Sequence, residues 1–228
     1  MKTIGLIGGM SWESTAHYYR IVNEEAGRLR GGLHSASVIV DSLDFAPIEA
    51  LQRAGRWDEA GTILARSAIR LEKAGAEIIG LATNTMHIVA EEITRAVKAP
   101  FLHIADPTAE ALKACGVTQA GLLGTRFTME MPFYKDRLRA YGIAPLMPDA
   151  DIPALNAIIY DELCRGIVRA ESRQVYVMAI SALAARGAEA VILGCTEIGM
   201  LIDESTSPLP VFDTAALHAR ALVKAALS

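Results

Sequence analysis

Short apolar runs alternate with longer amphipathic segments along almost the whole chain. The short runs end at glycine, proline or polar residues, as strands buried on both faces of a parallel sheet do. The longer segments repeat their apolar residues with the period of a helix. We predict strands at 2–7, 36–41, 76–82, 100–103, 119–124, 144–147, 188–194 and 209–212. Helices are predicted at 13–29, 57–74, 86–97, 107–114, 129–141, 152–165, 172–186 and 213–226.

This alternation predicts an α/β fold in which mainly parallel sheets are flanked by helices. A strand, a crossover helix and the next parallel strand form the repeating unit, and such crossovers are right-handed. Ligands of these sheets bind beyond the carboxyl ends of the strands. Candidate functional residues are therefore expected directly after strands.

The chain also reads as a duplication. The stretch 75–85 begins Gly-Ala-Glu and continues into an apolar run, and 187–197 does the same. A glycine-containing strand opens each half, and a proline, a short apolar run and an Asp with a Thr close each half. We predict a first half-domain at 1–106 and a second at 107–212, with a C-terminal helix at about 213–228 packing back on the first.

Composition narrows the class of protein. The 228 residues are 52% hydrophobic with a net charge of −4 and no block of like charges, which argues against a nucleic-acid or membrane partner. No apolar stretch approaches the length that spans a bilayer. Three widely spaced cysteines favour a reducing, cytoplasmic setting over a disulfide framework, and they form no zinc pattern.

Cys195 is the leading candidate for chemistry. It follows the apolar run Ala190–Leu193 and Gly194, a place where converging backbone N–H groups are expected to lower a thiol pKa. A free cysteine is more often a small buried hydrophobic residue, but this one is followed directly by the polar residues Thr196 and Glu197. In the duplicated stretch, Thr83 occupies the equivalent position.

Two reactive groups after equivalent strands of duplicated halves suit a reaction on both faces of one carbon. Racemisation is such a reaction, because one group removes the Cα proton and another returns a proton to the opposite face. Positioned donors that stabilise the enolate allow this chemistry without a cofactor.

Four stretches carry a resemblance to a known family. They are Ile4–Glu13, Asn84–His87, Leu122–Met129 and Gly194–Glu197. On these residues the chain resembles the cofactor-independent aspartate/glutamate racemases, and most closely their aspartate-racemase branch. The resemblance implies two α/β half-domains related by a pseudo-two-fold, with the active site in the cleft between them. It also implies an amino-acid substrate, no cofactor and a homodimer.

The first half departs from the family pattern. The family has Cys-Asn-Thr where this chain has Thr83-Asn84-Thr85, and a threonine hydroxyl is a poor base near neutral pH. Thr83 could relay a proton, or it could only donate a hydrogen bond while Cys195 acts alone. The family also contains decarboxylases, which pair a single cysteine of the second half with hydroxyl donors of the first half around a departing carboxylate. The Thr/Cys pair also resembles the broad-specificity amino-acid racemases, so we predict an amino-acid racemase. A decarboxylase or isomerase of a small dicarboxylate, and a catalytically weak amino-acid-binding protein, are the alternatives.

Further polar residues after strands are candidates for substrate binding. Asn84, Thr85, Thr125 and Thr196 offer donors for a carboxylate, although the same residue types cap helices. By resemblance, the loop at Met10 binds substrate, and Gln52 in the predicted loop 41–56 contacts it. His87, His103 and His218 show no metal spacing and are predicted to be structural residues, so no metal is assigned.

Overall fold

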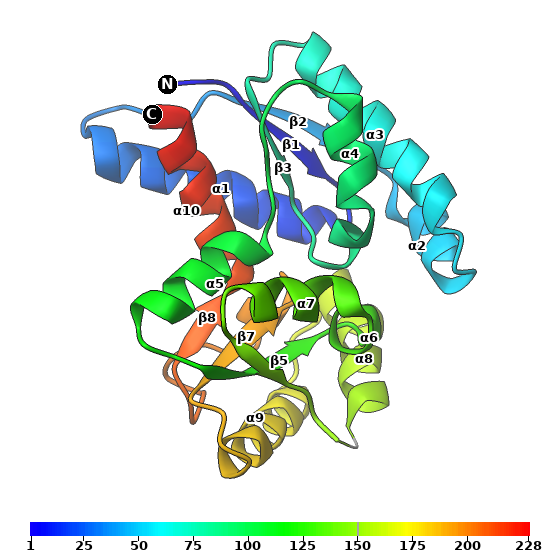
Figure 1. The fold of residues 1–228 in the computed structure, drawn as a ribbon, viewed down its shortest axis with the longest axis vertical. Coiled ribbons are helices and arrows are strands. Elements are labelled where there is room, and N and C mark those ends of the chain that lie inside the picture. Colours follow the sequence, from blue (N-terminus) through cyan, green and yellow to red (C-terminus); the bar gives the residue numbers. More distant parts are fainter. Residues whose placement is uncertain (150) are drawn as a thin grey trace. The chain divides into compact units, whose positions relative to one another are not determined.

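A computed structural model describes residues 1–149 and 151–228 of the chain. The chain divides into two compact units (Figure 1). Unit 1 comprises Met1–Ile104 together with His218–Ser228, and unit 2 comprises Ala105–Leu217. The chain therefore crosses between the units twice, at Ile104–Ala105 and at Leu217–His218.

Unit 1 is built on a four-stranded parallel sheet with the strand order β2-β1-β3-β4. Its strands are β1 (Ile4–Gly8), β2 (Val38–Ser42), β3 (Ile78–Leu81) and β4 (Phe101–Leu102). Its helices are α1 (Trp12–Arg30), α2 (Phe45–Arg53), α3 (Trp57–Lys73), the 3₁₀ helix η1 (Thr85–Val89), α4 (Ala90–Ala96) and most of α10 (Thr214–Leu227).

Helices cover both faces of this sheet. In Figure 1, α3 and α4 lie on one side of the strands, and α1 and α10 lie on the other. Glycines in the strands let the helices approach closely. A Cβ atom on Gly5 would lie 3.2 Å from Cβ of Leu71 on α3, and a Cβ atom on Gly80 would lie 2.5 Å from Cδ1 of Leu222 on α10. Both faces of β1 and β3 are therefore buried, which explains their continuous apolar sequences.

Unit 2 repeats the same topology. Its parallel sheet has the order β6-β5-β7-β8, which corresponds strand for strand to the sheet of unit 1. Its strands are β5 (Gln119–Gly124), β6 (Ala144–Leu146), β7 (Ala190–Gly194) and β8 (Val211–Asp213). Its helices are α5 (Ala105–Ala114), α6 (Arg126–Glu130), α7 (Pro132–Ala140), α8 (Ile152–Asp161), α9 (Ala170–Ala185) and the 3₁₀ helices η2 (Leu163–Arg165) and η3 (Ile198–Met200).

The predicted α/β class and the eight predicted strands are confirmed, with shifts of a few residues at the strand ends. The core of unit 2 includes Tyr176 and Leu183 of α9, packed with Val191 and Leu193 of β7. Identical strand orders in the two units support the duplication inferred from the sequence. In the described ranges 1–149 and 151–228, no helix has both the length and the apolar character needed to cross a bilayer.

Several predicted helices differ from those observed. The predicted helix 129–141 begins earlier, at Arg126, and is interrupted at Met131. Met131 is extended, with φ −77° and ψ 153°, because a residue before proline is disfavoured in the helical region and Pro132 follows. The predicted helix 152–165 ends at Asp161 and continues as η2. The predicted loop 41–56 contains the helix α2, so that prediction was wrong.

Candidate functional site

The carboxyl ends of two neighbouring strands bring Thr125 and Cys195 to the same edge of the unit 2 sheet. Gly124 at the end of β5 is in register with Gly194 at the end of β7. A Cβ atom on Gly124 would lie 2.7 Å from the carbonyl oxygen of Gly194, and one on Gly194 would lie 2.8 Å from that of Leu123. Only glycines fit this close approach, and each is followed directly by a candidate site residue.

Cys195 forms a buried polar cluster with the two residues that follow it. The thiol of Cys195 donates to Oε2 of Glu197 at 3.0 Å. The hydroxyl of Thr196 donates to the same oxygen at 2.8 Å. Cys195 is 7% exposed and Glu197 is 3% exposed, so both groups are largely removed from solvent. The acidic residue of the Gly-Cys-Thr-Glu motif therefore contacts the thiol directly, a role that the sequence analysis did not assign to it.

The expected lowering of the Cys195 pKa was wrong. Burial raises the pKa of the Cys195 thiol well above its ordinary value, and the negative charge of Glu197 raises this pKa further. Moreover, the helix that follows the cysteine is η3, which has only three residues and cannot supply a substantial helix dipole. Burial and the charge of Glu197 therefore both favour the protonated thiol over the thiolate.

Unit 1 gathers its own candidates at the corresponding edge. Ile7 of β1 is in register with Leu81 of β3, so Met10 and Thr83 follow neighbouring strands. Thr83, Asn84 and Thr85 are all buried. Gly9 has φ +88°, and a Cβ atom there would lie 2.0 Å from the carbonyl oxygen of Leu43. The loop that carries Met10 therefore depends on glycine at this position.

Gln52 lies on a helix and not in a loop. It is near the end of α2 and only 2% exposed. Its amide Nε2 donates to Sδ of Met86 at 3.0 Å. Met86 belongs to η1, which begins directly after Asn84, so α2 brings Gln52 against the segment that follows β3. The structure therefore unites Gln52 with the Thr83 segment within unit 1, although its predicted setting was wrong.

Thr125 performs the capping role that was considered as an alternative. It is the N-cap of α6, where its Oγ1 accepts a hydrogen bond from the backbone N–H of Thr128 at 3.3 Å. Asn84 precedes η1, but no side-chain cap is formed there. Capping therefore accounts for Thr125 and does not account for Asn84.

Three histidines that are far apart in the sequence lie together in unit 1. The ring centroid of His87 is 4.5 Å from that of His103 and 6.0 Å from that of His218. All three are buried. Within residues 1–149 and 151–228, no group of three or more His, Cys, Asp or Glu side chains is arranged to hold a metal ion.

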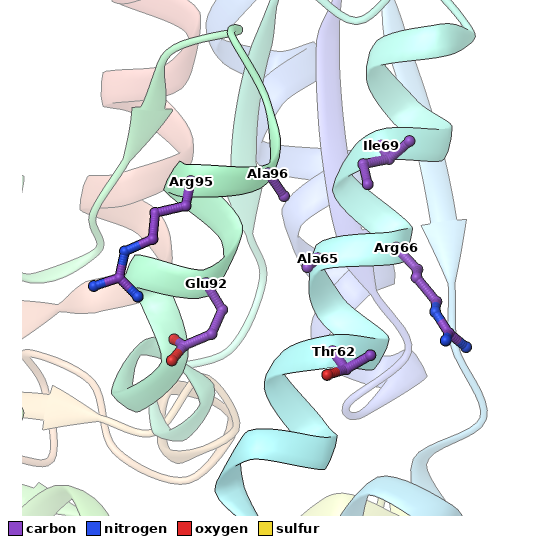
Figure 2. Close-up of a pocket in the computed structure, with 7 residues that line it drawn as sticks. All are labelled: Thr62, Ala65, Arg66, Ile69, Glu92, Arg95 and Ala96. Atoms are coloured by element: carbon purple, nitrogen blue, oxygen red, sulfur yellow. The ribbon is translucent and has the colours of Figure 1, made fainter.

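A surface groove lies between α3 and α4 (Figure 2), away from the sequence motifs. Its lining includes Arg66 of α3 and Arg95 of α4, whose side chains extend away from each other in Figure 2. Arg95 is paired with Glu91 of its own helix. The groove contains none of the predicted site residues and no set of converging polar groups.

Comparisons with known proteins identify the family of this chain. The model of the family Asp/Glu/hydantoin racemase matches residues 7–222. The chain belongs to this family. The structure of a candidate Asp/Glu racemase from Yersinia pestis is 50% identical, covers 100% of both chains and has a TM-score of 0.92.

Two further relatives of this racemase-family chain carry more specific descriptions. An aspartate racemase homologue from Pyrococcus horikoshii OT3 is 35% identical over 100% of both chains, with a TM-score of 0.85. The broad specificity amino-acid racemase RacX of Bacillus subtilis (strain 168) is 25% identical over 226 residues, which is 99% of this chain and 98% of RacX. Family membership assigns this protein to the racemases, which are isomerases.

Replacing Glu197 with glutamine is expected to lower the pKa of Cys195. The substitution keeps the shape of the side chain and removes the negative charge that opposes thiolate formation. The rate of iodoacetamide alkylation should rise with pH through a midpoint that lies at lower pH in the variant than in the wild type. Glu162→Gln, which changes a carboxylate held by Ser172, is the matched control. A midpoint that stays fixed or moves upward would contradict the electrostatic role of Glu197.

Proposed function

We propose that this protein interconverts the L and D forms of an amino acid by direct proton transfer at Cα, with Cys195 and Thr83 acting on opposite faces of that carbon. The carrying observation is the buried Cys195–Glu197 pair directly after β7, with Thr83 at the equivalent position after β3. Membership of the racemase family supports the reaction class. Aspartate or glutamate are the first substrates to test, and the similarity to RacX extends the test to other amino acids.

In this reaction Cys195 is the strong acid/base. Its thiolate removes the Cα proton and becomes a thiol, and the electron pair left on carbon delocalises into the substrate carboxylate as an enolate. The hydroxyl of Thr83 then delivers its proton to the opposite face of Cα and regains one from water, and the Cys195 thiol gives its proton to the hydroxide left behind, which restores the thiolate. Once Cys195 is protonated, Glu197 accepts its S–H hydrogen bond, which orients the thiol along one direction.

The two groups of this pair differ in base strength. A threonine hydroxyl can pass on a proton, but it is a weak base near neutral pH. Exchange of the Cα proton with solvent should therefore be faster for the enantiomer whose proton Cys195 removes than for the other, although kcat/KM for inversion is equal from both because enantiomers are equally stable. Because the pKa of Cys195 is raised, this faster exchange should accelerate as pH rises through and above neutrality.

Polar groups beside each reactive residue are suited to hold the substrate. Asn84 and Thr85 follow Thr83, and Thr196 follows Cys195. The amide of Asn84, the hydroxyl of Thr85 and the backbone N–H groups of both segments, that of Thr196 included, can donate to the substrate carboxylate, where charge develops in the enolate. Met10 and Gln52 lie in the same hydrophobic surroundings as Met86 and are proposed to shape the side-chain pocket.

Proton NMR in deuterated buffer tests the proposal. With a panel of amino acids, we expect loss of the Cα proton signal for at least one substrate and formation of its other enantiomer, detected by chiral chromatography. No exchange with any amino acid at high protein concentration would contradict the racemase proposal. Release of carbon dioxide from a substituted malonate would instead favour a decarboxylase that uses Cys195 with Thr83 as a hydrogen-bond donor.

A further inference from the structure

The imidazole of His87 links two backbone segments of unit 1. Its Nδ1 lies 2.8 Å from the carbonyl oxygen of Thr83. Since a carbonyl oxygen only accepts, Nδ1 carries the hydrogen and donates it. Its Nε2 accepts the backbone N–H of Ile104 at 3.1 Å. Both ring nitrogens are therefore engaged in the roles of one neutral tautomer.

The surroundings of His87 hold the ring in this orientation. His87 is only 2% exposed, and the rings of His103 and Phe101 pack against it with centroids at 4.5 Å and 5.6 Å. His218 is a further neighbour of the His87 ring, and its Nε2 donates to the carbonyl of Leu102 at 2.9 Å. Rotation of the His87 ring would break two hydrogen bonds in a closely packed interior, which is costly.

The carbonyl that His87 binds belongs to the proposed acid/base residue of unit 1. Fixing the carbonyl of Thr83 fixes the peptide plane that follows it, and with it the backbone torsion of Thr83. A β-branched threonine has few side-chain rotamers for a given backbone. The position of the Thr83 hydroxyl is therefore set by the same hydrogen bond that holds its carbonyl.

We propose that His87 is a positioning residue for Thr83, acting through the hydrogen bond from Nδ1–H to the Thr83 carbonyl. This inference rests on the proposed racemase function. It assigns His87 no contact with substrate. It predicts that loss of the Nδ1–H donor impairs proton delivery by Thr83 more than proton removal by Cys195.

Two conservative variants separate the two hydrogen bonds. The side-chain nitrogen of asparagine can reach the place of Nδ1, so His87→Asn keeps the donor to Thr83. The side-chain oxygen of glutamine can reach the place of Nε2, so His87→Gln keeps the acceptor for Ile104 and loses the donor. His218→Gln is the matched control, because it removes a buried histidine from the same cluster and leaves both bonds of His87 in place.

The readout is the ratio of inverted product to deuterated substrate of retained configuration, measured by chiral chromatography with mass spectrometry. Inversion requires Thr83, whereas exchange with retention requires only Cys195. Since a displacement of about 1 Å can cost a hundredfold in rate, we expect His87→Gln to lower this ratio by about tenfold to a hundredfold. His87→Asn and His218→Gln should keep it within about threefold, because general loss of folded protein lowers both rates together.

Failure of the proposed function and failure of this inference are distinguished by an NMR measurement that requires no catalytic turnover. If the wild type racemises and His87→Gln keeps the ratio of the wild type, the positioning role is overturned. If the wild type shows no exchange, the proposed function fails, and the ¹³C carbonyl shift of Thr83 decides the inference alone. Loss of the hydrogen bond should move this shift in His87→Gln and leave it near the wild-type value in His87→Asn. An unchanged shift in both variants would overturn the inference.

Discussion

Replacing Cys195 with alanine is expected to lower the rate of Cα proton exchange by about a thousandfold, within the range that a positioned acid/base group contributes. The variant keeps Thr83 and the substrate-binding groups, but no strong base remains beside the substrate. Exchange of the Cα proton, followed by NMR with the best substrate of the amino-acid panel, provides the measurement.

Cys164→Ala is the matched control for this experiment. Cys164 packs against the same hydrophobic cluster as Cys195, but it lies on η2 and has no proposed role in the reaction. Both substitutions remove one sulfur from the core of unit 2, and each should cost about 1 kcal/mol of stability, a typical value for a point substitution. A Cys195→Ala variant that retains more than a tenth of the wild-type exchange rate would contradict the assignment.

Replacing Thr83 with cysteine is expected to accelerate Cα proton exchange of the slower enantiomer by about a hundredfold. The substitution places a second thiol at the position equivalent to Cys195, and a thiol forms a reactive anion far more readily than a hydroxyl does. Initial rates of Cα proton exchange, measured separately for each pure enantiomer, should then become similar, whereas in the wild type they should differ strongly.

Thr83→Val is the companion variant, because valine keeps the β-branched shape and lacks the hydroxyl. It should lose inversion and keep exchange with retention of configuration through Cys195. If Thr83→Cys leaves Cα proton exchange of the slower enantiomer unchanged while Thr83→Val has wild-type activity, position 83 takes no part in proton transfer.

The central strands β1, β3, β5 and β7 were predictable because almost all of their residues are apolar or glycine and are buried on both faces. The helix α2 was missed because Pro47 lies inside it and proline normally ends a helix. In the structure, Asp44 caps α2 and Pro47 falls in the first turn, where the backbone N–H has no helical partner to lose. Whether Pro47 prevents the helix is therefore decided by its position in the first turn and not by its presence alone.

The sequence names candidate residues for the site but does not determine their electrostatics. The duplication placed Cys195 and Thr83 at equivalent positions, and the equivalent strand orders of the two sheets agree with that correspondence. The direction in which the pKa of Cys195 shifts depends on where the Glu197 carboxylate lies, and a sequence does not specify the orientation of a side chain. The histidine cluster was equally hidden, because His87 and His218 approach each other only through the path of α10.

The helix α10 has a consequence for how the protein is made. Its first residues belong to unit 2, and its part from His218 onward completes unit 1, where Leu222 packs on Gly80 and the carbonyl of Ala226 accepts the N–H of Lys2. Domains usually fold as they leave the ribosome, in N-terminal order. Here unit 2, a single uninterrupted segment, can finish first, while unit 1 must wait for the last residues. The half of the protein that is synthesised first is therefore the half that matures last.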